Sequence, residues 1–175
     1  MKKPLVSILI ASYNKEKYVK RCIRSCLNQT YKNIEIIFVD DSSRDNSYKF
    51  ASEFKKIKTY KKKRKKFNSK FNTFYQIDNF IYGLRKSKGK IISFLDVDDF
   101  YKNNKIKNIV QHFEKYGKSK ILFDKPMIYF SKKKVLKKNF YKDKGRGSLW
   151  PKFPPTSCIS LRRNFFLKIL NELKN

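Results

Sequence analysis

Residues 91–99 read Ile-Ile-Ser-Phe-Leu-Asp-Val-Asp-Asp, a mostly apolar run followed at once by a cluster of carboxylates. A short apolar run bounded by turn-forming residues is typical of a strand that is buried on both faces. Residues 35–39 form a second such run, and Asp40 and Asp41 follow it directly. Two buried strands that each end in paired carboxylates are the most informative pattern in this sequence.

The rest of the chain alternates between strand-like and helix-like segments. Besides 35–39 and 91–95, we predict strands at 5–11, 57–60, 121–123 and 127–130. Apolar residues at helical spacing predict helices over 18–27, 46–54, 74–84, 106–113 and 164–173, with Phe74, Ile77, Ile81 and Leu84 forming one core-facing stripe. The weak pattern of 132–155 indicates loops. Such alternation predicts an α/β fold with a mostly parallel sheet and helices on both faces, in a single domain spanning 1–175.

Composition limits the classes of protein that fit. The chain has 175 residues, of which 40% are hydrophobic, with 16 Phe and 11 Tyr, and this excludes a disordered tail. Its net charge of +30 favours anionic partners without choosing among them. Three cysteines (Cys22, Cys26 and Cys158) cannot all pair with one another, and neither a signal peptide nor an apolar run long enough to cross a membrane is visible. We therefore expect a reduced, cytoplasmic protein.

The carboxylates at 96–99 have two interpretations. Asp96 and Asp98 lie two residues apart, so in an extended segment their side chains point to the same side. Two carboxylates placed in this way favour a cation between them, and hard oxygen ligands suit Mg²⁺ or Mn²⁺ bound to phosphate oxygens. The alternative is a solvated acidic turn that caps the helix beginning near Lys105.

The pair Asp40-Asp41 is equally open. One carboxylate there could accept a hydrogen bond from a base N–H or a ribose hydroxyl. Alternatively the segment serves only to start a helix, with Ser42, Ser43 or Asp45 as its N-cap. Both roles are compatible if Asp41 faces a ligand while a neighbour caps. Because ligands of open parallel sheets bind beyond the carboxyl ends of the strands, both acidic clusters are expected at one site.

Four blocks of the sequence, at 6–14, 22–31, 34–47 and 89–99, resemble the family 2 glycosyltransferases, which have the GT-A fold. The resemblance covers 5–115 closely, and 154–163 resembles the later acceptor-side segment of that family. It therefore implies a nucleotide-sugar-binding half at 5–115 and a partial acceptor-side half at 116–175.

The resemblance also implies roles for single residues. Ala11, Ser12 and Tyr13 would line the nucleotide pocket, Asp41 would hold the base, usually uracil, Asp96 would lie near the ribose or the metal, and Asp98 would ligate the Mg²⁺ or Mn²⁺ on the diphosphate. The donor implied is a nucleotide-diphosphate sugar, UDP-linked in most members. The acceptor implied is a glycan or a lipid-linked glycan in the synthesis of bacterial surface polysaccharide.

The sequence departs from the family pattern in two places. Phe80 and Ile81 stand where many members have an Arg-Asn pair, so a cationic phosphate contact is either missing or supplied by Lys70 or Arg85. The catalytic base of inverting members is expected beyond Asn175, so no catalytic residue is assigned. The acids that follow Asp99 lie in no matching motif: Glu114, Asp124, Asp143 and Glu172. This leaves two alternatives. The first is an enzyme whose base lies elsewhere, beyond Asn175 or on another chain, and the second is a nucleotide-sugar-binding fragment without turnover. An incomplete sheet would also predict aggregation or a partner chain that covers it.

Other features carry weaker hypotheses. The basic block Lys-Lys-Lys-Arg-Lys-Lys (residues 61–66) fits a solvated loop, a contact with anionic lipid headgroups at the inner face of the membrane, or, least favoured, nucleic-acid binding. A basic binding module in which the acids serve only as caps is thus a third hypothesis. Cys22 and Cys26 share a helix face, but no second Cys/His pair exists, so core packing is favoured over zinc. Trp150 and the prolines around it fit an acceptor groove or a packed loop equally well.

Overall fold

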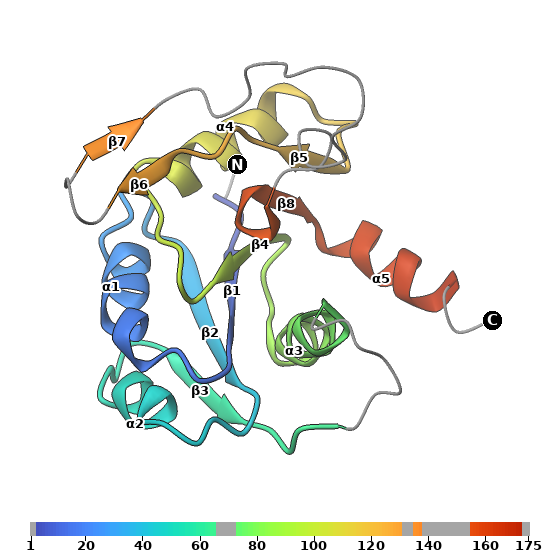
Figure 1. Ribbon diagram of the computed structural model, residues 1–175. Coiled ribbons are helices and arrows are strands. Elements are labelled where there is room, and N and C mark those ends of the chain that lie inside the picture. The colour runs from blue at the N-terminus through green and yellow to red at the C-terminus, as the bar shows by residue number, and fades with distance from the viewer. Residues whose placement is uncertain (1–2, 66–72, 131–134, 138–154, 173–175) are drawn as a thin grey trace, which may run out of the picture.

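A computed structural model describes residues 3–65, 73–130, 135–137 and 155–172 (Figure 1). Its main sheet has six strands in the order β3-β2-β1-β4-β8-β5. The bounds are Val6–Ser12 for β1, Ile34–Asp40 for β2, Lys58–Lys61 for β3, Ile91–Asp96 for β4, Ile121–Phe123 for β5 and Ile159–Arg162 for β8. A separate two-stranded sheet pairs β6 (Ile128–Phe130) with β7 (Val135–Lys137).

The first four strands are parallel to one another, as the alternation of elements predicted. β1 lies in the middle, with β2 on one side and β4 on the other. The register places Ser12 opposite Asp40 and Ala11 opposite Asp96, so all three strands end at the same edge. β8 runs antiparallel to both β4 and β5, an element that the sequence pattern did not reveal. The sheet is therefore mixed, but mostly parallel.

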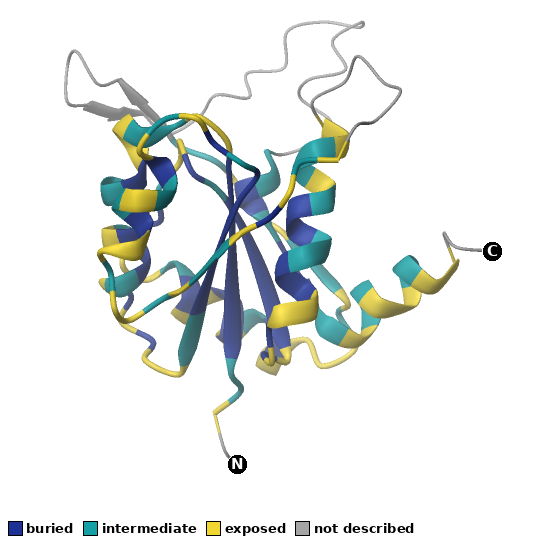
Figure 2. Ribbon diagram, turned by 90° about the horizontal axis from the view of Figure 1, so that it is seen from below, coloured by how far each residue is buried: buried dark blue, intermediate teal, exposed yellow. Residues whose placement is uncertain are grey.

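Helices cover both faces of this sheet, as expected (Figure 2). On one face lie α1 (Glu16–Leu27), α2 (Ser47–Ser52) and α4 (Lys105–Lys115), and on the other lie α3 (Thr73–Lys86) and α5 (Arg163–Glu172). Successive residues of β1 supply the two cores, because Ile8 and Ile10 pack into the first cluster and Leu9 and Ala11 into the second. In the described part of the chain no helix is both long and apolar enough to cross a membrane.

The predicted inner face of α4 is confirmed, whereas that of α3 is confirmed only at Leu84. Phe74 and Ile77 are 49% and 47% exposed, whereas Phe80 and Leu84 are buried. The helix turns a different face to the sheet because Gly83 has no side chain there. A Cβ at Gly83 would lie only 3.4 Å from Cγ2 of Val39, so the helix backbone itself packs closely on the strands.

Two smaller predictions can also be compared with the structure, and one is confirmed while the other is wrong at one strand. The three cysteines are free and buried, which agrees with core packing. β7 falls within the segment that was expected to form loops. Trp150, Pro151 and Pro154 lie outside the described residues, as do Lys70 and Asp143.

Candidate functional site

A cleft of about 390 Å³ opens at the carboxyl ends of β1, β2 and β4. It brings together all six residues that the sequence placed in a nucleotide and metal site: Ala11, Ser12, Tyr13, Asp41, Asp96 and Asp98. Side chains that the sequence did not suggest complete its lining: Lys15, Arg64, Tyr75, Gln76, Asn79 and Val97. The two acidic clusters thus meet at one site.

Backbone hydrogen bonds hold these strand ends beside one another. The amide of Asp41 donates to the carbonyl of Ser12 over 2.9 Å, and the amide of Val97 donates to the carbonyl of Ala11 over 3.3 Å. Pairing therefore continues one residue beyond β2 and β4. Directly after Asp41, Ser42 takes a φ of 58°, a left-handed backbone conformation that is uncommon outside glycine.

Asp41 is fully buried and makes two ion pairs with cations from the basic block. Nζ of Lys62 lies 2.6 Å from its Oδ1, and Nη1 of Arg64 lies 2.5 Å from its Oδ2. Lys62 also lies 2.7 Å from Oδ2 of Asp78, which pairs in addition with Lys65. Burial would raise the pKa of Asp78, but hydrogen bonds from Lys62 and Lys65 hold it below its usual value. Lys62 and Arg64 are thus internal partners of the site, which corrects the interpretation of the whole block as a solvated loop.

Arg64 is one of two cations that line the cleft, the other being Lys15. Its guanidinium carbon lies 3.8 Å from the ring centroid of Tyr13 and 3.8 Å from that of Tyr75. Arg85, one of the two residues expected to replace the family's arginine, is exposed and does not line the cleft. Lys70, the other, is not among the described residues. The guanidinium found in the cleft therefore comes from the basic block and not from α3.

Asp45 accepts amides at the start of two helices, although Asn46 and Lys15 hold the N-cap positions of α2 and α1. Oδ1 of Asp45 accepts the amide of Ser47 over 2.9 Å, and its Oδ2 accepts the amide of Glu16 over 3.0 Å. One carboxylate thus satisfies amides at the N-termini of α2 and α1 together. Burial would raise the pKa of Asp45, and these hydrogen bonds lower it below the usual value. Asp45 thus bonds the helix amides while Asp41 lines the cleft. The sequence had left open that both roles could exist side by side in this segment.

The second acidic cluster gathers carboxylates without an equal number of cations. Asp96 accepts a hydrogen bond from Nε2 of Gln76 over 2.5 Å, and its amide donates to Oγ of Ser157 over 3.0 Å. Burial, followed by the charges of Asp99 and Asp98, raises the pKa of Asp96 to about 7. None of these carboxylates caps α4, whose N-terminus has no side-chain cap. The alternative of an acidic helix-capping turn is therefore wrong.

Asp98 lies at the mouth of the cleft with Lys15 and Arg21 as neighbours. Nζ of Lys15 lies 2.9 Å from Oδ2 of Asp98, and Arg21 donates to the Asp98 carbonyl over 2.6 Å. The bond to Asp98 raises the pKa of Lys15. Among the described residues, no group of three or more His, Cys, Asp or Glu side chains is arranged around a metal position. A cation here would rely on the carboxylates of Asp96 and Asp98 together with waters and ligand oxygens, a donor set that suits Mg²⁺ or Mn²⁺.

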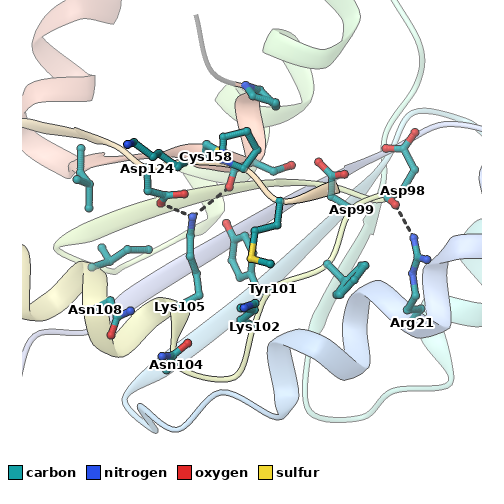
Figure 3. Close-up of a pocket in the computed structure, with 18 of the residues that line it drawn as sticks. Arg21, Asp98, Asp99, Tyr101, Lys102, Asn104, Lys105, Asn108, Asp124 and Cys158 are labelled. Carbon is teal, nitrogen blue, oxygen red and sulfur yellow. Dashed lines mark hydrogen bonds and ion pairs between the residues drawn. The ribbon is translucent and has the colours of Figure 1, made fainter. Parts of the chain in front are cut away.

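A larger cavity of about 810 Å³ lies on the other side of Asp98 (Figure 3). Asp98 and Asp99 border one end of it, and an ion pair between Lys105 and Asp124 borders another part. Nζ of Lys105 also donates to the carbonyl of Ser157 over 3.4 Å. Burial, with the nearby charge of Asp124, raises the pKa of Cys158 to about 12, so this thiol stays protonated. Asp98 is thus common to both pockets.

Comparison with known proteins identifies the family. Residues 7–170 match Glycosyl transferase family 2 over nearly the whole chain. The chain belongs to glycosyl transferase family 2. An uncharacterized glycosyltransferase of Nostoc is 28% identical to this family 2 chain. The match spans 94% of this chain and 52% of the Nostoc protein. The chain spans about half, or less, of the curated relatives that it matches.

Two solved structures show the fold of this family 2 chain. Residues 1–349 of Staphylococcus aureus TarS, solved in complex with UDP, match 95% of this chain and 48% of that TarS chain, with 19% identity and a TM-score of 0.69. A mannosyltransferase from Pyrobaculum calidifontis was solved with GDP-Man and Mn²⁺. Its match spans 65% of this chain and 33% of the mannosyltransferase chain, with 18% identity and a TM-score of 0.52. The fold is therefore GT-A-like, as the resemblance implied.

Proposed function

We propose that the 390 Å³ cleft binds a nucleotide-diphosphate sugar, UDP-linked, for transfer to a glycan acceptor. The observation that carries this proposal is the convergence of Asp41, Asp96 and Asp98 with Tyr13 at the carboxyl ends of three strands. Tyr13 offers an aromatic face for a base, and Asp41 offers a buried carboxylate that accepts a base N–H. TarS was solved with UDP, and this similarity supports the choice of donor.

We further propose that Asp96 and Asp98 hold Mg²⁺ or Mn²⁺. The raised pKa of Asp96 reflects burial and carboxylate repulsion, and a divalent cation would relieve the repulsion. When bound, such a cation would offset the charge that develops on a leaving diphosphate. The related mannosyltransferase was solved with GDP-Man and Mn²⁺, which supports this assignment.

The acceptor is proposed to enter through the 810 Å³ cavity, because that cavity meets the donor cleft at Asp98. A glycan, free or linked to lipid, in bacterial surface polysaccharide synthesis is the acceptor class that the family implies. A lipid-linked acceptor would bring the protein to the cytoplasmic face of the membrane, where a net charge of +30 favours an anionic surface.

Donor binding without turnover is the second candidate function. Asp124, a carboxylate that lines the larger cavity, is held in an ion pair by Lys105. A base that deprotonates the acceptor contributes about 10²–10⁴-fold to a rate. Release of UDP from a UDP-linked sugar, measured with and without added glycan, separates transferase from binder.

The first test is thermal unfolding with UDP, with and without Mn²⁺. A ligand at about 100 times its dissociation constant stabilises by about 2.7 kcal/mol, which raises the melting temperature by several degrees in a domain of this size. We expect Asp98→Ala to lose the Mn²⁺-dependent part of this shift. Glu53→Ala is the matched control, since it removes one exposed acid that pairs with Lys20 away from the cleft. A folded wild type that does not respond to UDP with Mn²⁺ would refute the proposal.

A further inference from the structure

The cleft already contains a flat group in the space between its two tyrosine rings. The guanidinium of Arg64 lies over the rings of both Tyr13 and Tyr75, at the same 3.8 Å from each centroid. At its edge, Nη1 donates to Oδ2 of the fully buried Asp41. Tyr13, Tyr75, Asp41 and Arg64 all line the donor cleft. A planar N–H donor is thus held between two aromatic faces with a carboxylate at its edge.

These are also the interactions that a nucleobase would make in the same place. A base stacks on aromatic side chains through its π-face, whatever its identity, and a uracil edge presents an N–H donor. A guanidinium is likewise planar, stacks on aromatic rings and presents N–H donors along its edge. Arg64 therefore satisfies both the tyrosines and Asp41 in the way that a base would satisfy them.

The partners of Asp41 also allow an exchange. Lys62 holds Oδ1 of Asp41 and Arg64 holds Oδ2, so the two oxygens have separate partners. The side chain of Lys62 is 6% exposed and is anchored by Asp78 as well, whereas that of Arg64 is 25% exposed. Arg64 is thus the partner that can leave. Its departure frees one carboxylate oxygen and the space between the rings while Lys62 still compensates the buried charge.

We propose that Arg64 is an internal competitor for the donor's base, a role that rests on the proposed donor binding in this cleft. It fills the space between Tyr13 and Tyr75 in the free protein and leaves it when a nucleoside diphosphate binds. Arg64 then sets the apparent affinity for the donor, because binding must include its displacement. If Arg64 holds the space nine times in ten, the apparent dissociation constant is about tenfold higher than the intrinsic one.

Calorimetric titration of UDP and of uridine, both with Mn²⁺, into matched variants tests this role. Arg64→Ala removes the competitor, and Lys63→Ala removes an equal charge from an exposed neighbour in the same block. We expect Arg64→Ala to bind both ligands more tightly, by roughly three- to tenfold, and by the same factor for each. Lys63→Ala should leave uridine binding unchanged. Arg64→Lys, which keeps the charge but lacks the flat group, should bind uridine more tightly than the wild type and serves if Arg64→Ala does not fold.

The outcomes separate this inference from the proposed function. Weaker binding of UDP with unchanged binding of uridine in Arg64→Ala would make Arg64 a phosphate contact and overturn the inference. Unchanged binding of both ligands would overturn it too. In either case UDP binding by the wild type would leave the donor cleft intact. Absence of UDP binding in wild type and variants alike would refute the proposed function, and this inference with it.

Discussion

Nζ of Lys62 lies between two acids, 2.6 Å from Oδ1 of Asp41 and 2.7 Å from Oδ2 of Asp78. The ammonium is buried, and so is the carboxylate of Asp41. Lys62 therefore joins the segment after β3 to the end of β2 and to α3, next to the donor cleft. Its contribution is to keep a buried carboxylate compensated whether or not Arg64 is in place.

Replacing Lys62 should destabilise the fold. Lys62→Met leaves Asp41 with one cationic partner in a buried site, and breaking a buried ion pair in this way costs about 3 kcal/mol or more. Urea unfolding followed by circular dichroism measures the change in unfolding free energy. Lys63→Met, at an exposed position of the same block, should stay within about 0.5 kcal/mol of the wild type. Equal losses in the two variants would contradict the structural role of Lys62.

The pKa of Asp96, raised to about 7, predicts a pH dependence of stability in metal-free buffer. An unfolded Asp has a pKa near ~3.9, so the folded protein holds this proton more tightly than the unfolded chain does. The stability from this group is therefore fully present below about pH 4 and is lost as the pH rises to about 7. Asp96→Asn mimics the protonated acid. We expect its stability relative to the wild type to increase between pH 5 and pH 8 in urea unfolding, and a constant difference would contradict this.

Glu35 predicts a pH dependence of stability that is opposite in sign to that of Asp96. Burial would raise its pKa, but hydrogen bonds from the amide of Lys88 and the hydroxyl of Ser7, with the ion pair to Lys58, hold the pKa below its usual value. The stability from this group is present above the unfolded pKa of ~4.3 and is lost as the pH falls through the folded value.

Glu35→Gln should therefore cost about 1–3 kcal/mol at pH 7 and progressively less below about pH 4. Unfolding in urea at a series of pH values measures this loss. The control Glu53→Gln alters an exposed pair with Lys20 and should cost no more than about 1 kcal/mol. If the loss of unfolding free energy in Glu35→Gln stayed the same in acid, the packing of Glu35 and not its charge would account for its contribution to stability.

Gly89 should tolerate no side chain. A Cβ at this position would lie 2.3 Å from Oγ and 2.6 Å from the backbone nitrogen of Ser7, and the backbone cannot yield as a flexible side chain does. We expect Gly89→Ala to lose about 1–3 kcal/mol or more through overpacking. Gly117→Ala is the comparison, since a Cβ there meets nothing within 4 Å. Differential scanning calorimetry of both variants tests this, and an undisturbed Gly89→Ala would be the contrary result.

The parallel part of the fold could be predicted because short, nearly continuous apolar runs alternate with segments of helical periodicity. Ile8, Ile37 and Leu95 belong to such runs, and all three are fully buried. The inner face of α3 was mispredicted because periodicity counts apolar side chains, whereas the decisive residue, Gly83, has none. β8 was missed because four residues that end in Arg162 carry too little pattern.

The acidic clusters that end two buried strands pointed to Asp41, Asp96 and Asp98, whereas Ala11, Ser12 and Tyr13 were placed only by the family resemblance. Lys62 and Arg64 could not be placed, since a run of like charges hides which members turn inward. Their spacing of two residues, directly after β3, is the available signal, because alternate residues of an extended segment face the same side. Tyr75 and Gln76 depend on how α3 rotates on the sheet, and that rotation was mispredicted.

The position of β8 between β4 and β5 has a consequence for synthesis on the ribosome. β1, β2 and β3 emerge in the order in which they pair, and β4 then joins β1 from the other side. The outer edge of β4 stays unpaired until Ile159–Arg162, the last strand of this sheet in chain order, has been synthesised. Through that interval the nascent chain presents an unpaired strand edge, the kind of surface that recruits neighbouring chains or chaperones.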